Sequence, residues 1–140
     1  MKLLDRKALL AKEKLEVEKV ELGKDEFVIV RQMTGRERDQ FEASLITEYK
    51  DSKGDAAFKT TTKDFRAKLA VCTLCDADGT ALLEPTDYEV LSQSMSAARL
   101  EKIIEVAQRL NKVTEVAKEA VLKNSDADQV GNSNSDSLSN

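Results

Sequence analysis

The sequence predicts an α+β fold in which an N-terminal β-hairpin packs against a bundle of about four helices. Residues 15–22 alternate apolar and polar side chains, a Gly23-Lys24-Asp25 turn follows, and residues 26–33 are rich in Val, Ile and Phe, as in the two strands of a hairpin. Residues 34–123 instead place apolar side chains three and four positions apart, which is typical of amphipathic helices. A lone hairpin is marginal in water, so one face of it should rest on these helices.

A chain of 140 residues favours one domain. We expect a flexible or helical arm at 1–14, a single α+β domain at 15–123 that ends in a long helix, and a polar tail at 124–140. The tail has too few apolar residues to offset its chain entropy and is predicted to be disordered. Since 41% of the chain is hydrophobic but only 4% is aromatic, the core should be mainly aliphatic.

Composition disfavours several classes of function. The chain has no His, which removes the commonest general base and the commonest nitrogen ligand for metals. The net charge is −4, and three of the 26 acidic residues lie in the tail, so residues 1–123 are nearly neutral. A large basic field for nucleic acid is therefore not expected. No apolar run approaches the roughly 18 residues of a membrane span, and a cytoplasmic location is the expected default.

The segments before residue 34 comprise a short helix and the hairpin. Asp5 to Lys14 has helix-forming residues but is short enough to be marginal alone. It is either an arm that docks on a neighbouring subunit or a mobile terminus. Within the hairpin the alternation breaks once, which predicts a β-bulge at Glu18-Lys19.

The next helix is predicted to start at a capping box formed by Thr34 and Glu37. It should run to about Lys50, and residues 51–61 should form a loop. Three apolar side chains spaced by four would define its buried face: Phe41, Leu45 and Tyr49. Arg36 and Arg38 lie in its first turn, where a helix disfavours cations, and they are either a charged partner contact or a solvated face.

Two further helices frame a turn in the second half. A helix is expected from Lys63 to about Leu74, and Asp76 to Gly79 should form a tight acidic turn. The apolar segment Ala81–Leu83 is either a third short strand or an extended piece. A second capping box at Thr86–Glu89 predicts a short helix to about Gln93, and its apolar residues, Val90 and Leu91, are expected to face inward.

The longest predicted helix begins after Ser94 or Ser96. Its first apolar stripe either closes the core or contacts a partner: Leu100, Ile103, Ile104, Ala107 and Leu110. The stripe then continues at helical spacing through Val113, Val116, Ala117, Ala120 and Val121. An unbroken helix to about Lys123 would span roughly 40 Å and overhang the body; otherwise it frays beyond Asn111. The second stripe is the predicted partner-binding surface, with Arg36 and Arg38 as further candidates.

Motifs for chemistry are weak. Cys72-Thr-Leu-Cys75 lacks the second ligand pair that zinc needs, and it falls near the end of a predicted helix, where a thiolate is disfavoured. Two small core residues are the favoured interpretation. Asp76-Ala-Asp78-Gly79 has its Gly at the wrong position for a calcium loop. We predict no catalytic, cofactor or metal site.

Three stretches carry a family resemblance: VIVRQMTGRERDQFE at 28–42, RAKLAVCTLCDADGTALLEPTDYEVLSQ at 66–93, and SxxxxRLEKIIEVAQRLN at 94–111. In their order and spacing they resemble the tail assembly chaperones of long-tailed bacteriophages, non-contractile or contractile. The resemblance covers about residues 17–111. It departs at Leu83, where the family often has an aromatic residue, and residues 112–140 lie outside it.

The resemblance implies a non-catalytic protein that binds the tape measure protein and helps to recruit tail tube subunits during tail morphogenesis. It also implies self-association, action in the host cytoplasm and absence from the mature virion. No nucleic acid, membrane or cofactor is expected. The alternatives are a small α+β regulatory or nucleic-acid adaptor, which would use Arg36 and Arg38, and a structural tail component.

Overall fold

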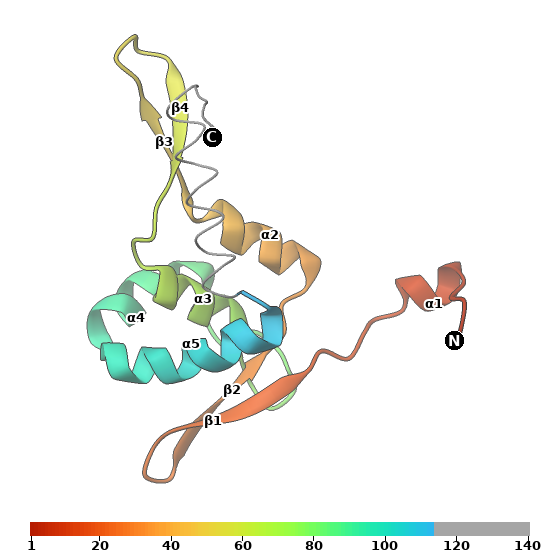
Figure 1. Ribbon diagram of the computed structural model, residues 1–140. Helices are drawn as coiled ribbons and strands as arrows, with labels where there is room; N and C mark the ends of the chain where they lie inside the picture. Colours follow the sequence, from red (N-terminus) through yellow and green to blue (C-terminus); the bar gives the residue numbers. More distant parts are fainter. Residues whose placement is uncertain (114–140) are drawn as a thin grey trace, which may run out of the picture.

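A computed structural model describes residues 1–113, which form an α+β fold as predicted (Figure 1). In chain order the elements are α1 (Arg6–Leu10), β1 (Val17–Gly23), β2 (Glu26–Arg31), α2 (Gly35–Ala43), β3 (Ile46–Lys50), β4 (Ala56–Thr60), α3 (Phe65–Thr73), β5 (Leu74–Cys75), the 3-10 turn η1 (Pro85–Asp87), α4 (Tyr88–Ser94) and α5 (Ala97–Asn111). The tail predicted at 124–140 lies outside the described residues.

The predicted N-terminal hairpin forms one sheet with a short third strand. The order is β1-β2-β5, and both neighbouring pairs are antiparallel. The predicted bulge was misplaced: pairing is regular at Glu18 and Lys19, and the register shifts between Glu21 and Gly23. There the chain enters a turn in which Asp25 adopts a φ of 62°. The irregularity therefore belongs to the turn, and the pairing of β1 with β2 before it is regular.

The third strand of the sheet is β5, at the end of α3, so of the two alternatives for Ala81–Leu83 the structure has the extended piece. That segment is extended and makes one bridge, between Ala81 and Cys75. It returns along β5 because the turn before it is tight. Asp76 Oδ1 accepts hydrogen bonds from the N–H groups of Asp78 (2.9 Å) and Thr80 (3.0 Å). Gly79 has a φ of 83°, which glycine adopts without strain.

The core lies between the three-stranded sheet and helices α2, α3 and α5. Phe41 and Phe65 meet edge to face, with ring centroids 5.6 Å apart. Ile103 and Leu69 are fully buried where α5 crosses α3. Burial of an aliphatic side chain of this size contributes about 2 kcal/mol. The first stripe of α5 is thus mostly core: Leu100, Ile103, Ile104 and Ala107 are buried, and Leu110 is half-buried.

The helix predicted to reach Lys50 ends at Ala43, and a second hairpin, β3–β4, replaces the rest of it and the predicted loop at 51–61. Phe41 and Leu45 are buried as expected, but Tyr49 projects outward from β3. The spacing by four that predicted a buried Tyr49 extends past Ala43, where the helix ends. Asp51 Oδ1 accepts from two turn N–H groups, of Lys53 and Asp55 (both 2.9 Å), and so closes the hairpin loop.

Helix α4 begins differently from the prediction. The reciprocal capping bonds join Glu84 and Asp87 around η1, where the Asp87 carboxylate accepts from the Glu84 N–H (2.8 Å). The expected box at Thr86–Glu89 was wrong by about two residues. Consequently Val90 is 68% exposed and does not face inward, while Leu91 is half-buried.

The long helix α5 starts after Ser96, whose hydroxyl accepts from the Arg99 N–H (3.2 Å). It stops at Asn111, because Lys112 turns left-handed with a φ of 57°. The Val113 N–H then donates back to the Gln108 carbonyl (2.9 Å), as in a Schellman cap. Of the two alternatives for this helix, the structure excludes the unbroken one and agrees with an end at Asn111. Among the described residues, no helix has the length and apolar character needed to cross a bilayer.

Candidate partner-binding surfaces

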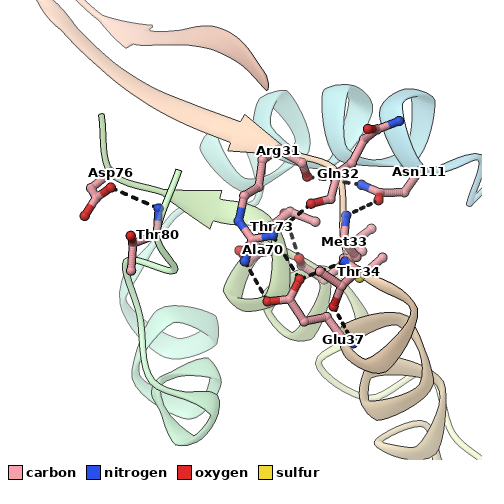
Figure 2. Close-up of polar contacts among 11 residues, drawn as sticks. Arg31, Gln32, Met33, Thr34, Glu37, Ala70, Thr73, Asp76, Thr80 and Asn111 are labelled. Atoms are coloured by element: carbon pink, nitrogen blue, oxygen red, sulfur yellow. Dashed lines mark hydrogen bonds and ion pairs between the residues drawn. The ribbon is translucent and has the colours of Figure 1, made fainter. Parts of the chain in front are cut away.

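A polar junction fixes the sheet, α2 and α5 to one another (Figure 2). Arg31, at the end of β2, is only 4% exposed and donates two hydrogen bonds to the Glu37 carboxylate, at 2.9 and 2.6 Å. Glu37 also completes the predicted capping box with Thr34: its carboxylate accepts from the Thr34 N–H, and its N–H donates to the Thr34 hydroxyl. One carboxylate thus caps α2 and neutralises a buried guanidinium.

Asn111 provides the second half of this junction. Its Oδ1 accepts from the Met33 N–H (2.6 Å), and its Nδ2 donates to the Ala107 carbonyl (2.9 Å). Its backbone carbonyl accepts from the Arg38 guanidinium (2.8 Å). The end of α5 is therefore fixed to the link between β2 and α2, and Figure 2 shows Asn111 and Met33 side by side.

The pKa values of groups in and near the junction are shifted, but not in a direction that makes a group reactive. The hydrogen bonds from Arg31 hold the pKa of Glu37 below its ordinary value. Burial raises the pKa of the thiols of Cys72 and Cys75. Raised thiol pKa values favour the unreactive protonated form, in agreement with the interpretation of both cysteines as packing residues. Within residues 1–113, no cluster of His, Cys, Asp or Glu has the arrangement to hold a metal ion.

The structure separates the residues predicted to bind a partner. Val113 is 4% exposed and belongs to the core, because the chain folds back after Lys112. Arg38 is occupied within the chain, with Glu42 (3.0 Å) and the Asn111 carbonyl. Of the two candidate arginines, Arg36 is the exposed one, on the first turn of α2. The remaining four candidates lie outside the described residues: Val116, Ala117, Ala120 and Val121.

The sequence reasoning missed one exposed apolar surface, which lies on the β3–β4 hairpin. Phe58 is 60% exposed and Ile46 is 52% exposed. The register pairs Ile46 with Thr60 and Glu48 with Phe58, so both apolar side chains lie on one face of the hairpin. Tyr49 lies on the other face under the Lys59 ammonium group, 5.4 Å from the ring centroid.

This hairpin projects from the body and is attached at its base (Figure 1). There the Thr61 N–H donates a hydrogen bond to the Leu45 carbonyl (2.7 Å). The Lys68 ammonium group donates to the neighbouring Ser44 carbonyl (2.8 Å). Among the strands of residues 1–113, β3 and β4 pair with each other and with no third strand. The β-branched residues Ile46 and Thr47 and the turn residues Asp51 and Gly54 were the signals that could have identified the hairpin.

A scan against protein-family models finds no match, and searches of the curated proteins and of the solved structures find no similar protein.

Proposed function

We propose that this chain is a non-catalytic tail assembly chaperone of a long-tailed bacteriophage. In this proposal it binds the tape measure protein, keeps it soluble and helps to recruit tail tube subunits during tail morphogenesis. It acts in the host cytoplasm and is left out of the mature virion. The motifs at 28–42 and 66–111 support the family assignment, and the exposed surfaces support a binding role.

The observation that carries the proposal is the β3–β4 hairpin. A two-stranded hairpin is at best marginally stable in water, because it has no second layer to cover its apolar side chains. Here Ile46 and Phe58 share one uncovered face. Such a hairpin gains stability when a partner covers that face. Its outer edges also offer unpaired N–H and C=O groups to an extended segment.

A tape measure protein suits this surface because, in the family that the chain resembles, it is long, helical and rich in apolar segments. The apolar face of such a helix would cover Ile46 and Phe58. The charged residues of the hairpin have both signs, including Glu48, Lys50 and Lys59, so they would keep the free protein soluble without selecting one charge on the partner.

Co-expression tests this proposal. The wild-type chain should keep the tape measure protein in the soluble fraction and co-purify with it. The double substitution Ile46→Asp and Phe58→Asp should reduce co-purification at least tenfold, because it places two charges on the apolar face. Phe27→Asp is the matched control: Phe27 is 53% exposed on the other hairpin, and its change should leave co-purification intact.

The competing functions make different predictions. A nucleic-acid adaptor would bind DNA or RNA in a salt-sensitive manner that Arg36→Ala weakens. A structural tail component would be found by mass spectrometry in purified particles. The chaperone proposal predicts a flat gel-shift titration and no copies in finished particles, and it fails if the tape measure protein stays insoluble beside the wild-type chain.

A further inference from the structure

A cavity of about 800 Å³ lies at the root of the N-terminal arm, between that arm and the junction of α2 with α5. The arm contributes Leu9 and Leu15 to its lining, and the body contributes Met33 and Leu110. Leu9 is 66% exposed, and the other three side chains are half-buried. The cavity therefore brings together apolar side chains from parts of the chain that are far apart in the sequence.

Hydrogen bonds hold the arm to the body at its root. The Glu16 N–H donates to the side-chain carbonyl of Gln32 (2.9 Å), and the amide of Gln32 donates to the Leu110 carbonyl (3.4 Å). Figure 1 shows α1 well away from the body, at the end of an extended segment. Its five residues are too few to form a stable helix alone, although Asp5 caps them through the Ala8 N–H (2.9 Å). A segment that fills the cavity beside the arm would hold it in place.

The described part of the chain ends at this cavity. Asn111 and Lys112, the last residues before Val113, belong to its lining. Residues 114–140 follow Val113 in the sequence and lie outside the described residues. They begin with the second stripe, whose members are spaced as on one side of a helix: Val116, Ala117, Ala120 and Val121. Three residues span at most about 11 Å, so the stripe begins within reach of the cavity.

This short connection favours a segment of the same chain as the occupant. An occupant joined to its site by a few residues acts at an effective concentration on the order of millimolar, which a second molecule does not match in dilute solution. The groove of about 660 Å³ between α4 and α5 suits the stripe less well. It lies at the first turn of α5, roughly 20 Å from Asn111 and out of reach of Val116.

Charge favours the same occupant. Residues 1–14 carry five basic and two acidic side chains, whereas residues 114–140 carry two basic and five acidic side chains. The charged residues of the cavity lining are Lys12, Arg38 and Lys112 against Glu13. The segment that follows Val113 therefore has a net charge opposite to that of the arm and of the cavity.

We propose that residues 114–123 close the cavity at the root of the arm of their own chain. The second stripe packs against the four apolar side chains of the lining, and the acidic residues after it lie near the basic arm. The segment acts as a strap that ties the arm to the end of α5. A partner that binds the second stripe would have to displace it from the cavity and would thereby release the arm. This inference does not rest on the function proposed for the β3–β4 hairpin.

Hydrogen exchange of the full chain tests the proposal. Val116→Asp with Val121→Asp places two charges on the second stripe. Leu122→Asp with Val130→Asp is the matched control, because both residues are apolar and neither belongs to that stripe. Amides of residues 8–15 should exchange at least tenfold faster in the stripe variant than in the wild type, and at the wild-type rate in the control. Circular dichroism should show the same fold in all three proteins.

Leu9→Asp gives the reciprocal measurement. Leu9 is exposed within the described residues, so this substitution should leave the fold intact. It should accelerate exchange in residues 114–123, because it places a charge in the cavity that the strap covers.

Protein concentration separates the strap from a contact between copies. Protection of residues 8–15 should stay the same over a hundredfold range of concentration. Protection that increases with concentration would assign the occupant to a second copy and overturn the inference. Equal exchange of residues 8–15 in the wild type and the stripe variant would also overturn it, since the cavity would then be closed by something else or not at all.

Discussion

At the scale of single residues, the polar junction of Arg31, Glu37 and Asn111 decides how the sheet and two helices are joined. Glu37 was predictable as a capping residue because it stands three positions after Thr34. Its second role, as the partner of a buried Arg31, could not be predicted, since nothing local indicates that the end of β2 points toward α2. The role of Asn111 depends on residues 78 positions away.

Asn111→Ala should lower the free energy of unfolding by about 2 kcal/mol, because it leaves the half-buried Met33 N–H without an acceptor. Urea unfolding measures the change. Lys102→Ala, on an exposed position of the same helix, should stay within about 0.5 kcal/mol of wild type. Equal effects of the two substitutions would show that Asn111 does not fix the end of α5.

Glu37 should make the free energy of unfolding depend on pH in the acid range. Its pKa is lower in the folded chain than in the unfolded chain, where a Glu has a pKa of about 4.3. Its stabilisation is therefore complete above that pH and is lost as the pH falls through the folded pKa. Glu37→Gln should lower the free energy of unfolding by about 2 kcal/mol near neutral pH, since it leaves the buried Arg31 charge unpaired. It should also reduce the fall of the unfolding free energy at low pH, here called the acid limb.

The control for that experiment is Glu42→Gln, which affects only the more exposed pair with Arg38. It should change neither the stability near neutral pH nor the acid limb by more than about 0.5 kcal/mol. An acid limb that is the same in wild type and Glu37→Gln would contradict the assignment of this dependence to Glu37.

At the scale of elements, prediction succeeded where one period continued through a whole segment and failed where an element was short. The hairpin β1–β2 was confirmed because its first strand alternates and its second is rich in β-branched and aromatic residues. The hairpin β3–β4 was taken for helix and loop, because Phe41 and Leu45 fit a helical spacing that Tyr49 then continued by coincidence. Periodicity over so few residues cannot locate a helix end, whereas the β-branched residues at 46 and 47 could have done so.

Because β3–β4 forms a sheet separate from β1-β2-β5 in the described part of the chain and joins the body at its base, the body should fold without it. Replacement of residues 46–60 by a short Gly-Ser link should preserve cooperative unfolding and change the unfolding free energy by less than about 1 kcal/mol. Leu45 and Thr61, which frame the link, are already joined by a hydrogen bond (2.7 Å), so the closure needs little adjustment. Loss of cooperative unfolding would show that the hairpin is part of the core.

At the scale of the whole molecule, the predicted class was right. The sequence left open whether the last helix overhangs the α+β body or ends near Asn111, and α5 ends there, where Val113 folds into the core. Within residues 1–113, the parts that project are the arm and the β3–β4 hairpin (Figure 1). Composition and periodicity predict what is buried; they do not indicate which exposed apolar residues gather on one surface.

The most direct test of the proposed chaperone function is hydrogen exchange of the chain alone and in complex with the tape measure protein. We predict that protection on binding is concentrated in residues 46–60, while the tip of the β1–β2 hairpin around Phe27 exchanges at the same rate in both samples. Unchanged exchange in residues 46–60 within a stable complex would contradict the assignment of the β3–β4 hairpin as the partner-binding surface.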